Sequence, residues 1–136
     1  MKVKAKLIDK LQFSAAADSN HAIVVDAGKK LSYDHGIRPK ELVLVGLATC
    51  TGMDVVSILK KMKIKFDDFL VEAEADSTEE HPKVFKNIHL KYIIQGKEID
   101  EQKFIKAIEL SQNRYCGVSA MLEKACKIDY SYTINA

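Results

Sequence analysis

The chain has 136 residues, 47% of them hydrophobic, and its 21 Lys and Arg residues nearly balance its 19 Asp and Glu residues. This length and composition predict a single domain over residues 1–136 with a hydrophobic core. Because the charges nearly cancel, the chain has no strong net field of either sign, so we expect neither nucleic acid nor a membrane surface as a partner. The first ten residues, MKVKAKLIDK, contain no continuous apolar segment of the kind found in signal peptides, and we expect a cytoplasmic protein.

The N-terminal region alternates apolar and polar side chains. Val3, Ala5 and Leu7 alternate with lysines, and the alternation returns at residues 11–15 and again in AIVVDA, residues 22–27. Alternation with a period of two is typical of strands with one buried face. The region therefore predicts a three-stranded meander.

A long helix is predicted over about residues 39–63. Pro39 suits the first helical position, Glu41 lies in the first turn, and lysines occupy the last turn, as the helix dipole favours. The apolar run from Leu42 to Leu59 is long enough to suggest a membrane span, but polar residues and glycines interrupt it. A buried core helix accounts for the same residues, and we expect no membrane span.

The second half of the chain predicts two more strands, two helices and a last strand. LVEAEAD (70–76) and NIHLKYII (87–94) both alternate and form an expected antiparallel pair. Asp100 is the expected N-cap of a helix that runs to about 113, followed by a short helix over about 119–124 and a strand, KIDYSYTI (127–134). The order β-β-β-α-β-β-α-α-β predicts an α+β fold.

The helix predicted over 39–63 is apolar on every side. A small domain rarely covers a helix all round by itself. We therefore expect a homodimer in which the second subunit covers part of this helix or of the sheet around it.

The three cysteines, Cys50, Cys116 and Cys126, are an odd number without CxxC spacing. This excludes a regular disulfide framework and a standard zinc knuckle, so we expect free thiols and no metal site. Cysteine is usually a small buried hydrophobe, and on spacing alone Cys50 could be an inert core residue. Cys116 lies in a polar segment near Arg114, which could acidify it, whereas Cys126 has no reactive neighbour and is interpreted as structural.

Cys50 lies too deep in its helix for the N-terminal dipole to ionise it. Asp54, one turn later on the same face, would raise the pKa of the thiol if ionised, or would hydrogen-bond within the core. Cys50 and Cys116 could form a peroxidatic and resolving pair, although the sequence alone does not bring them together.

Three stretches carry a family resemblance: RPKELVLVGLATCTGMDVVSILKKMKI (38–64), HPKVFKNIHLKYIIQGKEID (81–100) and AIELSQNRYCGVSAMLEKACKIDYSYTI (107–134). They resemble the OsmC/Ohr family, and within it the YhfA-like branch. The resemblance implies an OsmC-like fold, an intertwined α+β homodimer with central helices flanked by antiparallel sheets.

The resemblance also implies a function. In the peroxidase branches the helix cysteine attacks organic hydroperoxides and the later cysteine resolves it, so Cys50 would be peroxidatic and Cys116 resolving. Turnover would need no bound cofactor but an external dithiol reductant such as a lipoyl protein, and the role would belong to the oxidative stress response.

Two positions depart from the pattern of those branches. A glutamate follows the helix-opening proline there, whereas here Lys40 occupies that place and Glu41 comes one step later. Residues 1–37 contain no arginine, which leaves Arg38 and Arg114 as substitutes for the group that activates the thiolate. Arg38 and Glu41 lie about three turns before Cys50 and would have to act from the other subunit or through an intermediary.

The sequence therefore favours a thiol peroxidase that reduces organic hydroperoxides to alcohols through a disulfide between Cys50 and Cys116. The alternative is a noncatalytic dimer of the same fold that binds a small apolar ligand, or senses oxidant through its cysteines. A cation close to Cys50 would favour the enzyme.

Overall fold

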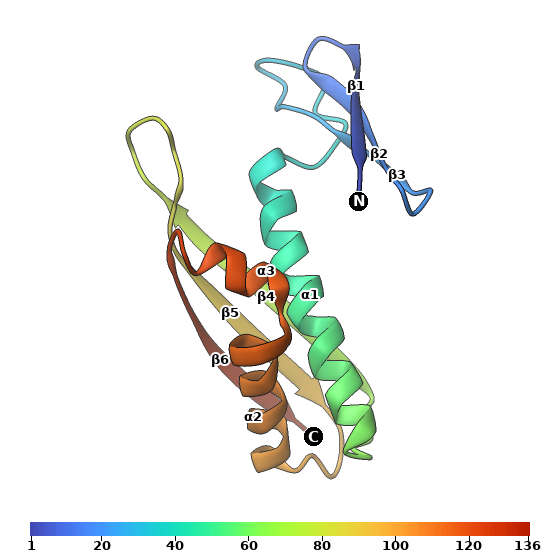
Figure 1. Cartoon of the computed structure of the whole chain (residues 1–136), viewed down its shortest axis with the longest axis vertical. Coiled ribbons are helices and arrows are strands. Elements are labelled where there is room, and N and C mark those ends of the chain that lie inside the picture. Colours follow the sequence, from blue (N-terminus) through green and yellow to red (C-terminus); the bar gives the residue numbers. More distant parts are fainter. The chain divides into compact units, whose positions relative to one another are not determined.

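The computed structural model describes all 136 residues, and they form two compact units, 1–43 and 44–136. Each unit contains one three-stranded sheet (Figure 1). The predicted α+β class and the predicted order of strands and main helices are confirmed, with one addition, a π-helical turn before the last short helix. In chain order the elements are β1 (Val3–Asp9), β2 (Gln12–Ala17), β3 (Ala22–Val25), α1 (Pro39–Lys61), β4 (Asp68–Ser77), β5 (Phe85–Gln95), α2 (Glu101–Leu110), η1 (Ser111–Tyr115), α3 (Gly117–Leu122) and β6 (Lys127–Asn135).

The first unit is the predicted meander. β2 lies between β1 and β3 and pairs antiparallel with both, with Ala15 opposite Ala5 on one side and Ile23 on the other. All seven residues of β1 are exposed, including Val3 and Leu7. Within its own unit this sheet therefore has an apolar face that nothing covers.

The segment that follows β3 is organised by a buried carboxylate. Asp26 is 2% exposed and accepts hydrogen bonds from the backbone N–H groups of Ala27 (2.8 Å) and His35 (3.1 Å). Burial raises the pKa of Asp26, but hydrogen bonds from Ser32, His35 and Ala27 outweigh it, and the net pKa is below its ordinary value.

α1 begins at Pro39 as predicted. Glu41 reaches back to accept the backbone N–H of Arg38 at 2.9 Å, which is one half of a capping box. The helix ends at Lys61, two residues earlier than predicted. Lys63 has a positive φ of 61°, and the next residue, Ile64, donates its N–H to the carbonyl of Leu59 (3.0 Å), so the chain leaves through a left-handed cap.

The sheet of the second unit has the strand order β4-β5-β6. β4 and β5 form the predicted antiparallel pair, with Val71 opposite Tyr92 and Ala73 opposite Leu90. β6, however, runs parallel to β5, so this sheet is mixed rather than wholly antiparallel as expected. The reason is the connection, because α2, η1 and α3 lie between the two strands and return the chain to the starting end of β5.

Both long helices of the second unit pack on one face of this sheet (Figure 1). Alternate residues of β5, Ile88, Leu90, Tyr92 and Ile94, are buried, so they point to a single face. They share one core cluster with residues of α1 and α2, namely Leu47, Val55, Leu59, Phe104, Ala107 and Ile108.

The C-terminal helices differ in detail from the prediction. Asp100 is the N-cap of α2, as predicted, and its carboxylate accepts the N–H of Lys103 at 3.1 Å. The expected helix to 113 changes at Ser111 into a π-helical turn, closed by a hydrogen bond from the N–H of Cys116 to the carbonyl of Ser111 (2.8 Å). α3 starts at Gly117, two residues before its predicted start, because Cys116 itself caps it.

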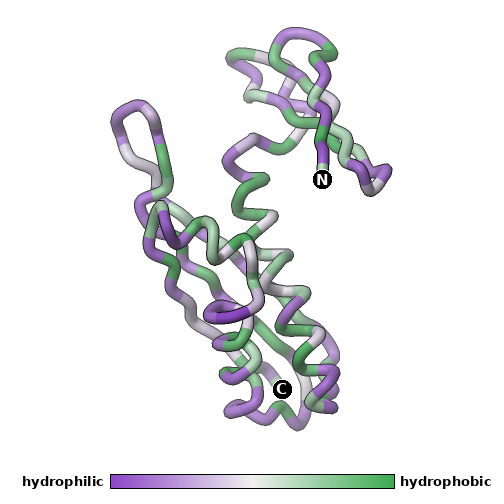
Figure 2. Tube along the Cα trace, in the orientation of Figure 1, coloured by the Kyte–Doolittle hydropathy of each residue, from purple (hydrophilic) through white to green (hydrophobic).

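α1 is long and apolar enough to cross a membrane by length and composition alone, and 22% of its apolar stretch is buried. Figure 2 shows hydrophobic residues along much of its length and a hydrophilic C-terminal end. The buried residues Leu47, Thr51, Val55 and Leu59 form one stripe, whereas Met53 is 72% exposed.

Candidate functional site

Three side chains from two helical segments form the candidate site. Cys50 and Asp54 are half-buried and lie one turn apart on α1, as the sequence predicted. Cys116 lies between η1 and α3 and is 3% exposed. The Sγ atoms of both cysteines and a carboxylate oxygen of Asp54 all lie within 4.8 Å of one another. The fold therefore brings together two thiols that are far apart in the sequence.

Cys116 is held by the start of α3. Its Sγ accepts a hydrogen bond from the backbone N–H of Ser119 at 3.3 Å, so the thiol acts as the helix N-cap. Burial raises the pKa of Cys116, and the neighbouring Cys50 raises it further, while the hydrogen bonds from Ser119 lower it in part. Cys116 therefore favours the protonated thiol form at neutral pH.

A buried network of polar side chains lies behind the cysteines. The hydroxyl of Thr51 lies 2.7 Å from those of both Tyr92 and Ser111. Ser111 donates to the Asp54 carboxylate at 2.9 Å, and the Gln112 amide donates to Thr51 and Tyr92 at 3.0 Å each. The network thus links α1, β5 and the π-helical turn, and it ends at Asp54.

The hydroxyl groups of this network can donate and accept in only one order. Because Ser111 uses its only hydroxyl proton on Asp54, Thr51 must donate to Ser111, and Tyr92 must then donate to Thr51. Burial raises the pKa of Tyr92 to about 12, so its hydroxyl remains protonated and able to donate. The chain of donors therefore ends on the Asp54 carboxylate.

Sequence reasoning missed this network. It identified Asp54 and noted a hydrogen bond in the core as one of its possible roles, which the bond from Ser111 confirms. It did not find Thr51, Tyr92, Ser111 or Gln112. The available signal was the spacing of Thr51 on α1, since it falls on the buried stripe four residues from both Leu47 and Val55.

The other predicted site residues have partners of their own. Arg38 pairs with Asp34 (2.5 Å) and donates to the carbonyl of Gly36 at 2.7 Å, and Glu41 caps the start of α1. The guanidinium of Arg114 lies over the ring of Tyr115, 5.4 Å from its centroid. Their predicted part in activating a cysteine stays a prediction.

A hollow of about 400 Å³ adjoins the site in the second unit. Asp54 lines it together with mostly apolar residues, one serine and one lysine, namely Ser57, Ile58, Lys61, Met62, Leu110 and Tyr115. A ligand with an apolar group could therefore reach the edge of the cysteine cluster.

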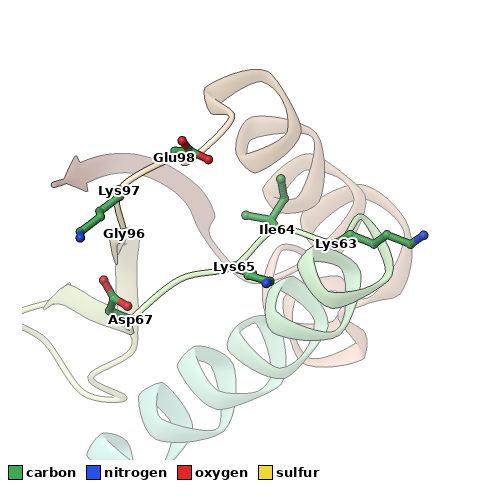
Figure 3. Close-up of a pocket in the computed structure, with 7 residues that line it drawn as sticks. All are labelled: Lys63, Ile64, Lys65, Asp67, Gly96, Lys97 and Glu98. Carbon is green, nitrogen blue, oxygen red and sulfur yellow. The ribbon is translucent and has the colours of Figure 1, made fainter.

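Another hollow, of about 600 Å³, lies at the loops that follow α1 and β5 (Figure 3). Its lining is mainly charged, and Figure 3 shows Lys63 and Lys97 pointing away from each other toward solvent. None of the predicted site residues lines it. Its size alone therefore does not make it the functional site.

Comparison with known proteins identifies the family. A model of the OsmC-like protein family matches residues 32–131. The protein YhfA of Escherichia coli K12 is 35% identical over 136 residues, which are 100% of this chain and 99% of the relative. The chain belongs to the OsmC-like family. The resemblance to the YhfA-like branch found in the sequence is thereby confirmed.

Solved structures place this OsmC-like protein in the same fold. A hypothetical protein from Aquifex aeolicus VF5 is 28% identical with a TM-score of 0.84, and the match covers 99% of this chain and 97% of the other. An organic hydroperoxide resistance protein from Elizabethkingia anophelis is 18% identical with a TM-score of 0.71 over 99% of this chain and 97% of the other. At that identity the second likeness shows the shared fold alone.

Proposed function

We propose that this OsmC-like protein is a thiol peroxidase that reduces organic hydroperoxides to alcohols, with Cys50 as the peroxidatic and Cys116 as the resolving cysteine. The observation that carries the proposal is the approach of the two sulfur atoms to within 4.8 Å of each other from separate helical segments. A resolving thiol must reach the oxidised sulfur directly, and small side-chain rotations would close this distance to a bond.

The order of the two steps follows from exposure. Cys50 is half-buried and so partly accessible to a substrate, whereas Cys116 is buried and its raised pKa keeps it a thiol.

The reaction has two chemical steps. The thiolate of Cys50 attacks the terminal oxygen of the hydroperoxide, the O–O bond breaks, and the alkoxide takes a proton to leave as the alcohol. Cys50 is then a sulfenic acid, and the Cys116 thiol attacks its sulfur, releasing water and forming the disulfide. An external dithiol must reduce this disulfide for turnover.

The surroundings favour an organic substrate over hydrogen peroxide. The hollow beside Asp54 is lined by Ile58, Met62 and Leu110, which suit an apolar group. Burying about 60 Å² of apolar surface contributes about 1.5 kcal/mol, or roughly tenfold in rate or affinity. One solved protein of this fold is an organic hydroperoxide resistance protein, and we extend that substrate class to this chain as part of the proposal.

The experiment treats reduced protein with cumene hydroperoxide and, separately, with hydrogen peroxide, and follows thiol loss and intact mass. We expect rapid formation of a disulfide between Cys50 and Cys116 with the organic peroxide, roughly tenfold slower reaction with hydrogen peroxide, and no disulfide in Cys50→Ser. Cys126→Ser is the matched control and should react like the parent. A rate no faster than that of an unactivated free thiol would refute the proposal.

A second candidate is a noncatalytic dimer that binds a small apolar ligand. It is favoured by the engagement of the two arginines, since Arg38 pairs with Asp34 and Arg114 lies over Tyr115. The same experiment separates the candidates, because this one predicts slow oxidation of all three cysteines.

A further inference from the structure

We propose that Cys50, Cys116 and Asp54 form a binding site for a divalent cation of the zinc class. The inference goes beyond the proposed peroxidase function and does not depend on it. Two thiolates and one carboxylate are a donor set that Zn²⁺ accepts, and its catalytic-type sites use three protein ligands with a fourth position left open.

The geometry of the cluster suits such an ion. With Zn–S distances of about 2.3 Å and tetrahedral angles, two coordinating sulfurs lie about 3.8 Å apart. The two Sγ atoms and the Asp54 oxygen already lie within 4.8 Å of one another. Rotation of the Cys50 and Asp54 side chains, both half-buried on α1, can close the remaining gap without a change of the backbone.

The donors are also oriented by their neighbours. Ser111 donates to Oδ2 of Asp54 at 2.9 Å, which leaves the second carboxylate oxygen free for an ion. The backbone N–H of Ser119 donates to the Cys116 sulfur at 3.3 Å and holds this sulfur at the start of α3. Hydrogen bonds that orient the ligands in this way are typical of metal sites.

The charge of the Asp54 carboxylate also suits a cation. Thr51 and Tyr92 direct their hydroxyl protons toward Ser111 and so toward Asp54, which makes the carboxylate an acceptor beside two ionisable thiols. The carboxylate, and the two thiols once the ion has displaced their protons, would together balance the charge of a divalent cation. Asp54 also lines the hollow of about 400 Å³, which gives an ion a path of entry and leaves room for water at the fourth position.

Binding would exchange thiol protons for the ion. Each thiol loses its proton to solvent as its sulfur bonds the metal, so one ion releases up to two protons. The ion would also hold both sulfurs in their reduced form, because neither could then attack a peroxide or form the disulfide. A metal of this class would therefore switch off the proposed peroxidase.

The experiment titrates the reduced, chelator-treated protein with Co²⁺ and follows the thiolate-to-cobalt charge-transfer absorption, then displaces the Co²⁺ with Zn²⁺. We expect one ion per chain, with the absorption lost in Cys50→Ser and Cys116→Ser and kept in Cys126→Ser. Ser111→Ala should weaken binding about 10- to 100-fold, and Asp54→Asn at least as much.

A second measurement needs no variant. Alkylation of the wild-type protein with iodoacetamide, with and without Zn²⁺, should show Cys50 and Cys116 protected and Cys126 unprotected when the modified peptides are identified by mass. Absence of the charge-transfer band in the reduced parent, or equal protection of all three cysteines, would overturn the proposal. Since this test contains no peroxide, and a chelator added to the peroxidase assay removes any bound metal, either proposal can fail without the other.

Discussion

Thr51 illustrates how one side chain organises the site. It is fully buried on α1, where the neighbouring residues of the same stripe, Leu47 and Val55, are apolar. A buried hydroxyl is costly unless it is hydrogen-bonded, and Thr51 contacts three polar partners, Tyr92, Ser111 and Gln112. It therefore ties α1 to the segment that carries Cys116.

Replacing this hydroxyl should destabilise the protein. Thr51→Val keeps the shape of the side chain but leaves the buried Tyr92 hydroxyl without its acceptor, so we expect a loss of about 1–3 kcal/mol in the free energy of unfolding. Ser19→Ala is the control, since Ser19 is exposed in a turn of the first unit and its hydroxyl meets only His21, and it should change stability by less than about 0.5 kcal/mol. Urea unfolding measures both, and equal stabilities of the two variants would contradict the role of the network.

The candidate site could be predicted only in part from single residues. Cys50 and Asp54 were expected on one face because helical spacing places residues four apart together, and the structure confirms it. The approach of Cys116 depends on how α1, η1 and β5 pack, which no local pattern encodes. The family resemblance supplied that pairing where spacing could not.

At the scale of elements, the π-helical turn determines where the second cysteine lies. A π turn inserts one extra residue per turn and is often found at functional sites. Here it includes Ser111 and Gln112, which enter the buried network, and it ends at Cys116. A prediction from helical periodicity continues the helix to 113, because the apolar pattern of α2 does not show the change in hydrogen bonding.

The same limit explains β6. Its alternation predicts a strand, and Ile128 and Ile134 pack against the core as expected. The direction of pairing is not contained in that pattern, since a parallel neighbour is made possible by the long helical connection from β5.

The segment between β3 and α1 should respond to acid through Asp26. The pKa of Asp26 is lower in the folded protein than in the unfolded chain, where it is about 3.9. The ionised carboxylate therefore stabilises the fold above that pH, and this stabilisation is lost as the pH falls through the pKa of the folded protein. We expect the amide NMR signals of Ala27 and His35, whose N–H groups bond to this carboxylate, to lose their folded positions below about pH 4. Asp26→Asn should remove this pH dependence, whereas Asp18→Asn, at an exposed position, should keep it. An unchanged titration in Asp26→Asn would contradict the assignment.

At the scale of the whole molecule, the main feature to explain is the apolar surface that stays exposed. α1 exposes Met53, Val45 and Val43, and β1 is exposed along its whole length. Either a second protein chain or a bilayer could cover such surface. Polar groups in the middle of α1, Thr51 and Asp54, bond to partners on other elements, so the helix is committed to a protein core on that side. We therefore propose a second copy of the chain as the cover, in line with the homodimer expected from the sequence.

A shallow apolar groove gives this proposal a test. It measures about 340 Å³ and is lined by Ala48, Thr49, Gly52, Met53, Val56, Phe69 and Val71. Met53→Glu would place a charge on this surface, and burying it in a dimer would cost several kcal/mol unless it were paired. We expect the parent to elute from size exclusion with light scattering at about twice the 15.3 kDa chain mass, without detergent, and Met53→Glu at the mass of one chain.

Gln102→Glu is the control, because it adds the same charge at an exposed position of α2 and should remain dimeric. A monomeric parent would exclude the dimer, and a dimeric Met53→Glu would move the interface away from this groove. A protein that stays in solution only with detergent would instead favour a bilayer around α1.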